Sequence, residues 1–219
     1  MNESTPLRVA IWGAAGHARV VADALGLLPA YRVAGFIDDV TPGRRGEAFC
    51  GSRILGGREV LARLGDDGVR CLALAFGHNE ARLRLADELA SQGFELPVVV
   101  HPSAVVARDA VIGEGSFVGP LAVVNAAARI GRVVIVNSGV IVEHDAVVGD
   151  GVHLSPRACL AGGVQVGRAS WVGAGAVVKE RVAIGAGATV GMGAVVIRPV
   201  PDGATVVGCP AEQRWKNAT

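Results

Sequence analysis

Residues 128–154 read ARIGRVVIVNSGVIVEHDAVVGDGVHL, and an aliphatic residue returns in this stretch at every sixth position. The spacing extends in both directions without an insertion, and gives sixteen aliphatic positions: Val106, Ile112, Val118, Val124, Ile130, Val136, Val142, Val148, Leu154, Leu160, Val166, Val172, Val178, Ile184, Val190 and Val196. Two residues before each of them stands Ala, Ser or Val, and glycine follows eight of the sixteen. Residues i−2 and i of a strand point to the same side, and glycine permits a sharp turn. The period therefore predicts a β-solenoid in which each coil buries the apolar positions of its neighbours.

The predicted solenoid explains an unusual composition. The chain has 219 residues, of which 51% are hydrophobic, only 4% are aromatic and 31 are glycine. A narrow interior that accepts one aliphatic and one small residue per layer has no space for aromatic rings. The high hydropathy does not predict a membrane protein, because no uncharged run reaches the ~18 residues of a membrane span.

Charge and cysteine spacing exclude further classes. A net charge of +1 argues against a nucleic-acid-binding protein. The four cysteines are far apart and form no CxxC pair, which favours free thiols over a zinc site or a disulfide framework. Residues 1–6 lack the features of a signal peptide. We therefore expect a cytoplasmic protein that does not insert into membranes.

Residues 7–97 lack the six-residue period and predict alternating strands and helices. Apolar segments predict strands at residues 7–12, 31–37 and 71–76, with a helix after the first and third, and Asn79 is expected to cap the second helix. This alternation predicts a small parallel sheet, whose ligands bind at the carboxyl ends of the strands. Three loops fall at that edge: Gly13–His17, Asp38-Asp39 and Gly77-His78-Asn79.

These loops have the chemistry of a nucleotide site. Gly13 to His17 reads GxxGH, which is a poor match to a dinucleotide fingerprint, but amides at a helix N-terminus can hold a phosphate. A carboxylate after the second strand can bond a ribose hydroxyl or a base edge. The two arginines of residues 41–46 are expected to be solvated.

The repeat and the tail Gly208-Cys209-Pro210-Ala211 resemble the hexapeptide-repeat acyltransferases, in which three hexapeptides form one coil of a left-handed parallel β-helix. The handedness is implied by the resemblance, since it runs against the usual right-handed crossover. The N-terminal motifs resemble more narrowly the UDP-4-amino-sugar N-acetyltransferases of bacillosamine synthesis and their sialic-acid O-acetyltransferase relatives. Their strand–GASGHG turn, paired Asp and Gly-Asn-Asn match the three loops, although Ala15, Ala18 and His78 replace the usual Ser, Gly and Asn.

The resemblance implies two domains. Residues 1–97 would form a small Rossmann-like α/β domain that binds a nucleotide sugar, and residues 98–219 a left-handed β-helix with a C-terminal tail that binds acetyl-CoA. The implied substrate-binding residues are Ala15, Gly16, His17, Asp38, Asp39 and Gly77.

Acetyl transfer from a thioester needs a base for the attacking group and donors for the oxyanion. Of the five histidines, only His144 and His153 lie within the repeats. Glu143 and Asp145 flank His144, and carboxylates can orient an imidazole and raise its basicity. The resemblance implies that His144 is the general base and that the following carboxylate assists it. The sequence leaves open which carboxylate contacts the ring, because neighbours on a strand point opposite ways.

Acetyl-CoA is the co-substrate that the resemblance implies. His153 matches a histidine that contacts it near the reacting end, and Gly162 and Ala174 match positions whose amides line its groove. Gly191 or Met192 lies further along that groove, and Asn137 replaces a turn glycine and offers a polar contact.

We expect the acetyl group to pass to the amino group of a UDP-linked 4-amino sugar by direct attack; the alternative is O-acetylation of a sugar of the sialic-acid type by the same base. A γ-type carbonic anhydrase would need three histidines per zinc, so we expect no metal. A scaffold or ice-binding surface is disfavoured because threonine is scarce in the repeats. Because solenoid faces need cover, and the family closes into trimers with the active site between subunits, we expect a homotrimer.

Overall fold

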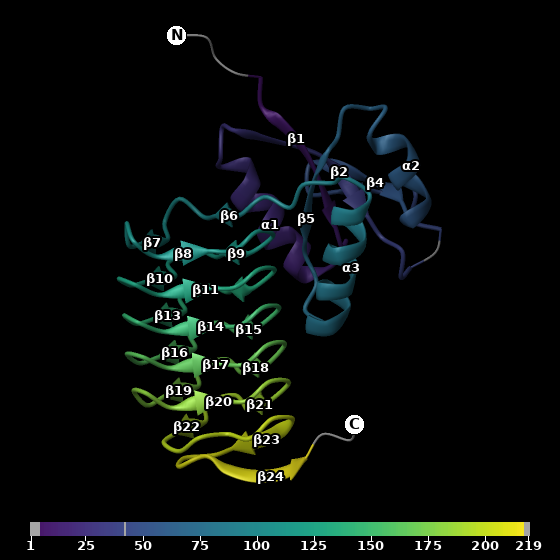
Figure 1. Ribbon diagram of the computed structural model, residues 1–219. Coiled ribbons are helices and arrows are strands. Elements are labelled where there is room, and N and C mark those ends of the chain that lie inside the picture. Colours follow the sequence, from purple (N-terminus) through teal and green to yellow (C-terminus); the bar gives the residue numbers. More distant parts are fainter. Residues whose placement is uncertain (1–4, 42, 217–219) are drawn as a thin grey trace.

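The computed structural model describes residues 5–41 and 43–216. An α/β domain lies beside the upper end of a long stack of coils (Figure 1). Glu95 still bridges to Cys71 of the sheet, and the strand at Val99–Val100 already pairs with a coil, so residues 96–98 separate the two parts. No helix among the described residues is long and apolar enough to cross a membrane.

The N-terminal sheet has the strand order β3-β4-β2-β1-β5. Its strands are β1 (Leu7–Trp12), β2 (Tyr31–Ile37), β3 (Ala48–Phe49), β4 (Ser52–Gly56) and β5 (Cys71–Leu74). The helices are α1 (Gly16–Gly26), α2 (Leu61–Leu64) and α3 (Asn79–Ser91), with a 3-10 turn η1 (Arg58–Val60). The three predicted strands run parallel to one another, as expected. The sheet is nevertheless mixed, because β3, which the sequence did not predict, runs antiparallel to β4.

The coils form three parallel sheets, which confirms the solenoid. We call them face I, face II and face III. Face I contains β7 (Val105–Val106), β10 (Val123–Val124), β13 (Ile141–Val142), β16 (Cys159–Leu160), β19 (Val177–Val178) and β22 (Val195–Val196). Face II contains β8 (Val111–Ile112), β11 (Arg129–Ile130), β14 (Val147–Val148), β17 (Gln165–Val166) and β20 (Ala183–Ile184). Face III contains β6 (Val99–Val100), β9 (Phe117–Val118), β12 (Ile135–Val136), β15 (His153–Leu154), β18 (Trp171–Val172), β21 (Thr189–Val190), β23 (Ala204–Val207) and β24 (Glu212–Lys216).

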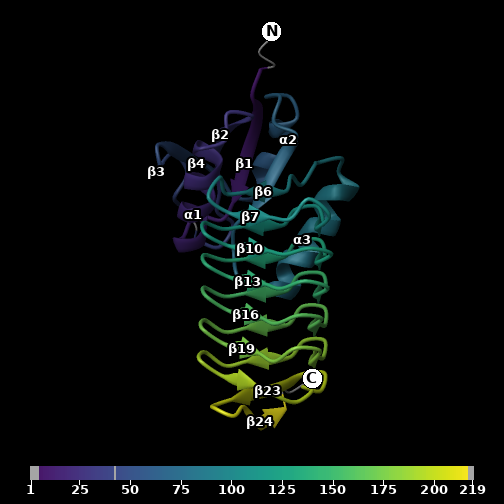
Figure 2. The ribbon, with the colours of Figure 1, turned by 90° about the vertical axis from the view of Figure 1, so that its left-hand side faces the viewer.

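Strand pairing shows that three hexapeptides make one coil. Ile141 pairs with Val123 in the coil before it and with Cys159 in the coil after it, in parallel register. Figure 2 shows the strands of face I stacked one above the other. The C-terminal strand β24 pairs antiparallel with β23 and closes the last coil.

The interior is filled as the period predicted. The second residue of each strand and the residue two before it point inward, and Val124, Ala128 and Val142 are among those with no exposed surface. The turns between faces use left-handed residues, and even Val133 has a φ of 58°. That conformation costs a residue with a Cβ about 1–2 kcal/mol, so packing between coils must hold it.

The α/β domain covers only part of the β-helix. Phe117 and Ile135 of face III pack into the same hydrophobic core as α1 and β1, and α3 hydrogen-bonds to the turns between faces II and III. We call these turns corner II–III (residues 113–116, 131–134, 149–152, 167–170 and 185–188). Corner I–II (residues 107–110, 125–128, 143–146, 161–164 and 179–182) lies opposite face III, and corner III–I comprises residues 101–104, 119–122, 137–140, 155–158, 173–176 and 191–194.

Candidate functional site

The carboxyl ends of β1, β2 and β5 are joined closely enough to exclude a side chain. Gly13 N donates to Ile37 O (2.8 Å), and Ala75 N donates to Trp12 O (2.8 Å). Gly13 has a φ of +125°, and a Cβ on it would lie 2.7 Å from Ala75 O. The GxxGH turn therefore begins with glycine because the backbone of β5 passes directly against it.

The two predicted aspartates follow β2 and do different things. Asp38 Oδ1 accepts from the amides of Val40 and Thr41 (3.1 Å each). Although burial raises it, these amides and Arg44 hold the pKa of Asp38 below its usual range. Asp38 therefore fixes the loop that begins after β2.

Asp39 leaves more of its acceptor capacity free. Its Oδ1 accepts from Trp12 Nε1 at 3.1 Å, and its Oδ2 lies 3.8 Å from the guanidinium of Arg58. The side chain is 30% exposed, against 8% for Asp38. Asp39 is thus the carboxylate with room for a ligand donor.

Arg44 corrects the expectation that the arginines of residues 41–46 are solvated. Its guanidinium donates to Glu47 and Asp38 at 2.8 Å and to Ala14 O at 3.1 Å. The bond to Glu47 is the largest influence that raises its pKa. The sequence did not predict that Arg44 pairs with Asp38 and Glu47, because the segment that contains these residues has no periodicity.

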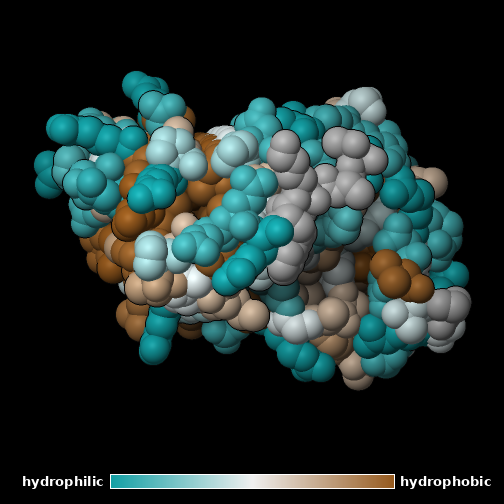
Figure 3. All heavy atoms as spheres, turned by 90° about the horizontal axis from the view of Figure 1, so that it is seen from below, coloured by the Kyte–Doolittle hydropathy of each residue, from teal (hydrophilic) through white to brown (hydrophobic). Residues whose placement is uncertain are grey.

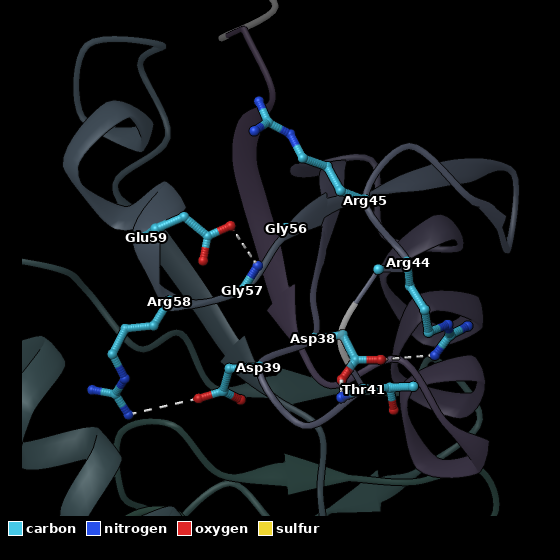
Figure 4. A pocket seen from close by; sticks show the side chains of 10 residues that line it. Asp38, Asp39, Thr41, Arg44, Arg45, Gly56, Gly57, Arg58 and Glu59 are labelled. Carbon is cyan, nitrogen blue, oxygen red and sulfur yellow. Dashed lines mark hydrogen bonds and ion pairs between the residues drawn. The ribbon is translucent and has the colours of Figure 1, made fainter.

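Two adjoining cavities open at this sheet edge. One of about 650 Å³ is lined by residues of all three loops, including Ala15, His17, Asp38, Asp39, Gly77 and His78. The second, of about 610 Å³, shares Asp38, Asp39, Thr41, Arg44 and Arg58 with it and extends to Gly57 and Glu59. In Figure 4 Asp38 points to Arg44 and Asp39 to Arg58. The loops thus converge as predicted, and Gly16 begins α1 between them.

His17 is held against the β-helix. Its ring packs edge-on against Phe117, with 5.4 Å between ring centroids, and its Nε2 is buried with no hydrogen-bond partner among the described residues. Burial, and then the charge of Arg82, lowers the pKa of His17 to about 4. His17 is therefore a neutral imidazole at pH 7.

The third loop differs from the prediction in its capping residue. His78, not Asn79, caps α3, since its Nδ1 accepts from Ala81 N at 3.2 Å. The Asn79 side chain instead donates to Ala169 O and Ser170 O, at 3.0 and 2.9 Å. The sequence could not predict these contacts of Asn79, because the accepting carbonyls lie about ninety residues further along the chain. Gly77 keeps its predicted place at the cavity wall.

His153 joins the cavity wall to the coils. A Cβ on Gly77 would lie 3.7 Å from His153 Nδ1, and Asn137 Nδ2 lies 3.4 Å from His153 Nε2. Burial, then the charges of Arg82 and His17, lowers the pKa of His153 to about 4 against a smaller opposing effect of the Gly77 backbone. Two residues predicted to contact acetyl-CoA thus meet each other beside Gly77 of the third loop.

His144 lies at corner I–II and pairs with one of its two neighbours. Its Nδ1 is 2.8 Å from Asp145 Oδ2, while Glu143 accepts from the His144 backbone N (3.3 Å). Asp145, which occupies a left-handed turn position with a φ of 60°, is the carboxylate that contacts the ring. This answers the question that strand alternation left open.

Gly162 lies directly opposite the ring in the next coil. A Cβ on Gly162 would come within 2.7 Å of both Cε1 and Nε2 of His144. The His144 and Asp145 side chains are 63% and 67% exposed. The absence of a side chain at residue 162 therefore leaves His144 Nε2 bordered by backbone and open space.

The predicted residues fall into separate groups in one chain. Asn137 and His153 lie behind Gly77 of the cavity wall, and the His144 group (Glu143, His144, Asp145, Gly162) lies at the corner opposite face III. Ala174, Gly191 and Met192 occupy corner III–I; Met192 is exposed, whereas a Cβ on Gly191 would meet Val207 at 2.6 Å. Among the described residues, no three His, Cys, Asp or Glu side chains gather as a metal ion would need.

Sequence reasoning missed three residues around the cavities. Trp12 and Arg58 lie together in the wall, with the guanidinium 5.3 Å from the ring centroid. Arg82 is 1% exposed and lies behind His17 and His153. Trp12 stood in a recognised strand, but a helical arginine usually faces solvent, so the sequence held no signal for Arg82.

Comparison with known proteins places this geometry in a family. The PglD N-terminal domain family matches residues 8–89. UDP-N-acetylbacillosamine N-acetyltransferase from Bacillus subtilis (strain 168) is 38% identical over 110 residues, and the matched region spans 50% of this chain and 50% of that protein. The acetyltransferase domain of PglB from Neisseria gonorrhoeae FA1090 is 37% identical with a TM-score of 0.88, covering 94% of this chain and 99% of that one. PerB from Caulobacter crescentus, solved with CoA and GDP-perosamine, is 37% identical with a TM-score of 0.89, covering 94% and 97%.

Identity and shape agree over nearly the whole length of the solved relatives, through both the α/β domain and the β-helix. The chain therefore belongs to the PglD-like hexapeptide-repeat sugar N-acetyltransferases.

Proposed function

We propose that the protein transfers the acetyl group of acetyl-CoA to the amino group of a nucleotide-linked amino sugar, with His144 as general base. The observation that carries this proposal is the His144–Asp145 pair facing a side-chain-free Gly162. Relatives support the substrate classes: the PglB domain has been solved with acetyl coenzyme A, and PerB with CoA and GDP-perosamine.

The pair supports Nε2 as the nitrogen that acts as the base. An ionised carboxylate only accepts, so Asp145 Oδ2 holds the proton of the neutral ring on Nδ1. Nε2 then carries the free lone pair, on the side of Gly162. As the sugar amine attacks the thioester carbon, Nε2 takes its proton, and collapse of the tetrahedral intermediate breaks the C–S bond and releases CoA thiolate. Backbone N–H groups of the coils stabilise the oxyanion.

The nucleotide sugar would occupy the two cavities. The amides of Ala15, Gly16 and His17 at the start of α1 would face the diphosphate. Asp39 and the cavity of Figure 4 would take the ribose and base. Neutral His17 supplies a hydrogen bond rather than charge. We propose a UDP-linked 4-amino sugar as the acceptor, in keeping with the UDP-N-acetylbacillosamine N-acetyltransferase relative.

Acetyl-CoA would bind along the coils. Gly162 leaves the space in which the thioester approaches His144. Asn137 and His153, which lie within 3.4 Å of each other, offer polar contacts near the reacting end. Ala174, Gly191 and Met192 would line the groove further along, chiefly through their backbone.

We further propose that the site is shared between copies in a homotrimer. The cavity lies against face III, and His144 lies at the corner opposite face III, so His144 of one chain can serve only the cavity of another. Face I supplies an apolar surface for association: Val105, Ile141 and Val177 are 63%, 37% and 43% exposed. Figure 3, which views the molecule from below, shows hydrophobic residues (brown) gathered among hydrophilic ones in the left half of the picture, where the β-helix lies.

Release of CoA thiol tests the reaction. The purified protein would be given acetyl-CoA with a UDP-linked 4-amino sugar, a GDP-linked 4-amino sugar or a sialic acid. We expect turnover with a nucleotide-linked amine, and a product whose new amide is seen by mass spectrometry. Acetylation of the sialic acid alone would show an O-acetyltransferase, and turnover with none of the three would contradict the proposal.

A further inference from the structure

Helix α3 presents polar side chains to the β-helix that the acetyl-transfer chemistry does not use. The helix runs alongside the stack of coils, next to corner II–III (Figure 1). Its polar contacts return at one position of three successive coils, namely Val133, Gly151 and Ala169, whose φ values are 58°, 66° and 58°. These left-handed residues donate their own N–H to the coil before them, and their carbonyl oxygens accept from side chains of α3.

Arg82 serves two of the coils. Its Nε donates to Val133 O at 3.0 Å, and its Nη2 donates to Gly151 O at 2.9 Å. Its Nη1 donates to Phe76 O at 3.1 Å, in the loop that lines the cavity. Burial lowers the pKa of Arg82 to about 10, so the guanidinium is still charged at pH 7.

The acceptors of Arg82 are uncharged, which is unusual for a buried cation. They are backbone carbonyls and the Asn79 amide oxygen, 3.1 Å from Nη2. A buried charge is normally paired with an opposite charge. The carbonyl oxygens do not neutralise the guanidinium. They fix its orientation, because its rigid planar set of donors fits only one arrangement of acceptors.

Asn79 extends the network to the third coil. Its Nδ2 donates to Ala169 O and Ser170 O, while its Oδ1 accepts from Arg82. Two exposed ion pairs flank these bonds, Glu80 with Arg168 at 2.8 Å and Asp87 with Arg132 at 2.6 Å. Exposed pairs contribute little, so the buried amide and guanidinium fix the register.

The position of α3 along the coils matters because of the loop that precedes it. That loop borders both the cavity proposed for the nucleotide sugar and His153, which is proposed to contact acetyl-CoA. Phe76 and Gly77 line the cavity, and Gly77 lies against His153 on the second of the three coils. A slip of α3 along the corner would move the cavity relative to His153 without disturbing either part internally. Misplacement of reacting groups by about 1 Å can lower a rate about 100-fold.

We propose that Arg82 and Asn79 are positioning residues: they lock α3 in register with three coils and so hold the nucleotide-sugar cavity at a fixed position against the coil of His153. This inference rests on the proposed function, since the register has catalytic meaning only if the two sites cooperate.

The test compares Arg82→Lys and Asn79→Ala with the matched control Arg84→Lys. The Arg82→Lys substitution keeps the charge and an aliphatic stem but loses the fork, and Arg84 is an exposed arginine on the same helix. For each variant we would measure kcat, the Kd of UDP, GDP and CoA by calorimetry, and hydrogen exchange of α3 and corner II–III.

We expect Arg82→Lys to lower kcat about 10- to 100-fold and Asn79→Ala by about 3- to 10-fold. The Kd of CoA and of the nucleotide the wild type prefers should change less than about twofold, because each binds within one part. Exchange should rise along α3 and at residues 131–134 and 149–152 in both variants, and Arg84→Lys should match the wild type.

A kcat of Arg82→Lys within twofold of the wild type overturns the inference, and so does a loss of kcat matched by equal weakening of CoA or nucleotide binding. If Arg82→Lys does not fold, the same outcomes are judged on Asn79→Ala. If the wild type shows no acetyl transfer, the proposed function is contradicted. The hydrogen-exchange measurement alone then shows whether Arg82 and Asn79 hold α3 against the coils.

Discussion

At the scale of single residues, the proposed chemistry depends on a paired imidazole and on a missing side chain opposite it. Asp145 lies 2.8 Å from His144 Nδ1, and Gly162 leaves Nε2 unobstructed. His17 and His153 are poorer candidates for the proposed base. Both are buried, and their pKa values of about 4 mean that they gain a proton much less readily than an ordinary histidine.

Replacement of the base gives the first prediction. His144→Ala should lower kcat about 10²- to 10⁴-fold, the usual contribution of a general base, and leave CoA binding nearly unchanged. Steady-state kinetics with calorimetry would measure both. Near-normal turnover would remove His144 from the role, and Glu143→Gln, which leaves the Asp145 contact intact, provides the comparison.

The buried histidines predict how stability depends on pH. Their pKa is about 4 in the folded chain, against an ordinary value of 6.5. Between these values the unfolded chain binds more protons, so the free energy of unfolding falls as pH falls from 6.5 toward 4 and is fully recovered above 6.5. Denaturation at several pH values should show this slope.

A double variant isolates that slope. In His17→Gln with His153→Gln neither side chain titrates in this range, and the dependence on pH should become shallower than in the wild type. An unchanged slope would mean that the two rings titrate like exposed histidines, and it would contradict their burial.

At the scale of the elements, one short strand recurs throughout the coils. Each contributes one inward aliphatic residue, and each turn one inward small residue. The interior of a coil is closely packed, because Val124, Ala128 and Val142 are wholly buried between their neighbours above and below. Added volume should therefore be tolerated outside the coil and not inside it.

Two alanines of one coil test this. Ala188 has no exposed surface, whereas Ala183 is exposed on face II. We predict that Ala188→Leu lowers the free energy of unfolding by about 1–3 kcal/mol through overpacking, and that Ala183→Leu changes it much less. Thermal or chemical denaturation would measure the difference. Equal effects at both sites would contradict the packing of the interior.

The elements also show what sequence can predict. The period located the strands of the coils because each inward position makes the same contact eighteen residues on. β1, β2, β5, α1 and α3 were predicted from apolar runs and turn residues. β3, β4 and α2 were missed, since residues 41–64 are rich in arginine and glycine and have no clear period.

The site was predicted where a motif is local and missed where partners are distant. His144 with its flanking carboxylates, and the loops after β1 and β2, can be read in a few consecutive residues. The roles of Asn79 and Arg82 depend on carbonyls fifty to ninety residues away. The capping rule assigned Asn79 to its own helix because nothing local indicated a competing partner.

At the scale of the whole molecule, the cavity proposed for the nucleotide sugar and the proposed base lie on different sides of the chain. The α/β domain packs against the upper coils of face III and against corner II–III, whereas His144 lies at corner I–II. The proposed shared site would need a neighbouring copy, related by a rotation that brings one chain's corner I–II to the next chain's cavity. A ring of three copies would close with every site complete.

The trimer gives a prediction of mass. Sedimentation equilibrium of the purified chain should yield three times 22.3 kDa across a wide concentration range. Ile141→Lys with Val177→Lys, placed on the exposed side of face I, should shift the chain toward monomer while its β-helix remains folded. A stable monomer in the wild type would contradict the shared site.

Subunit mixing tests whether each site is shared between two chains. His144→Ala lacks the proposed base, and Asp39→Lys, which removes the carboxylate acceptor and puts a longer side chain into the cavity, should block nucleotide-sugar binding; each variant alone should be inactive. Co-expressed in equal amounts, they form mixed trimers in which about a quarter of the base–cavity pairs are intact. CoA release should recover to about that fraction of wild type. Mixed trimers, verified by native mass spectrometry, that remain inactive would contradict the shared site.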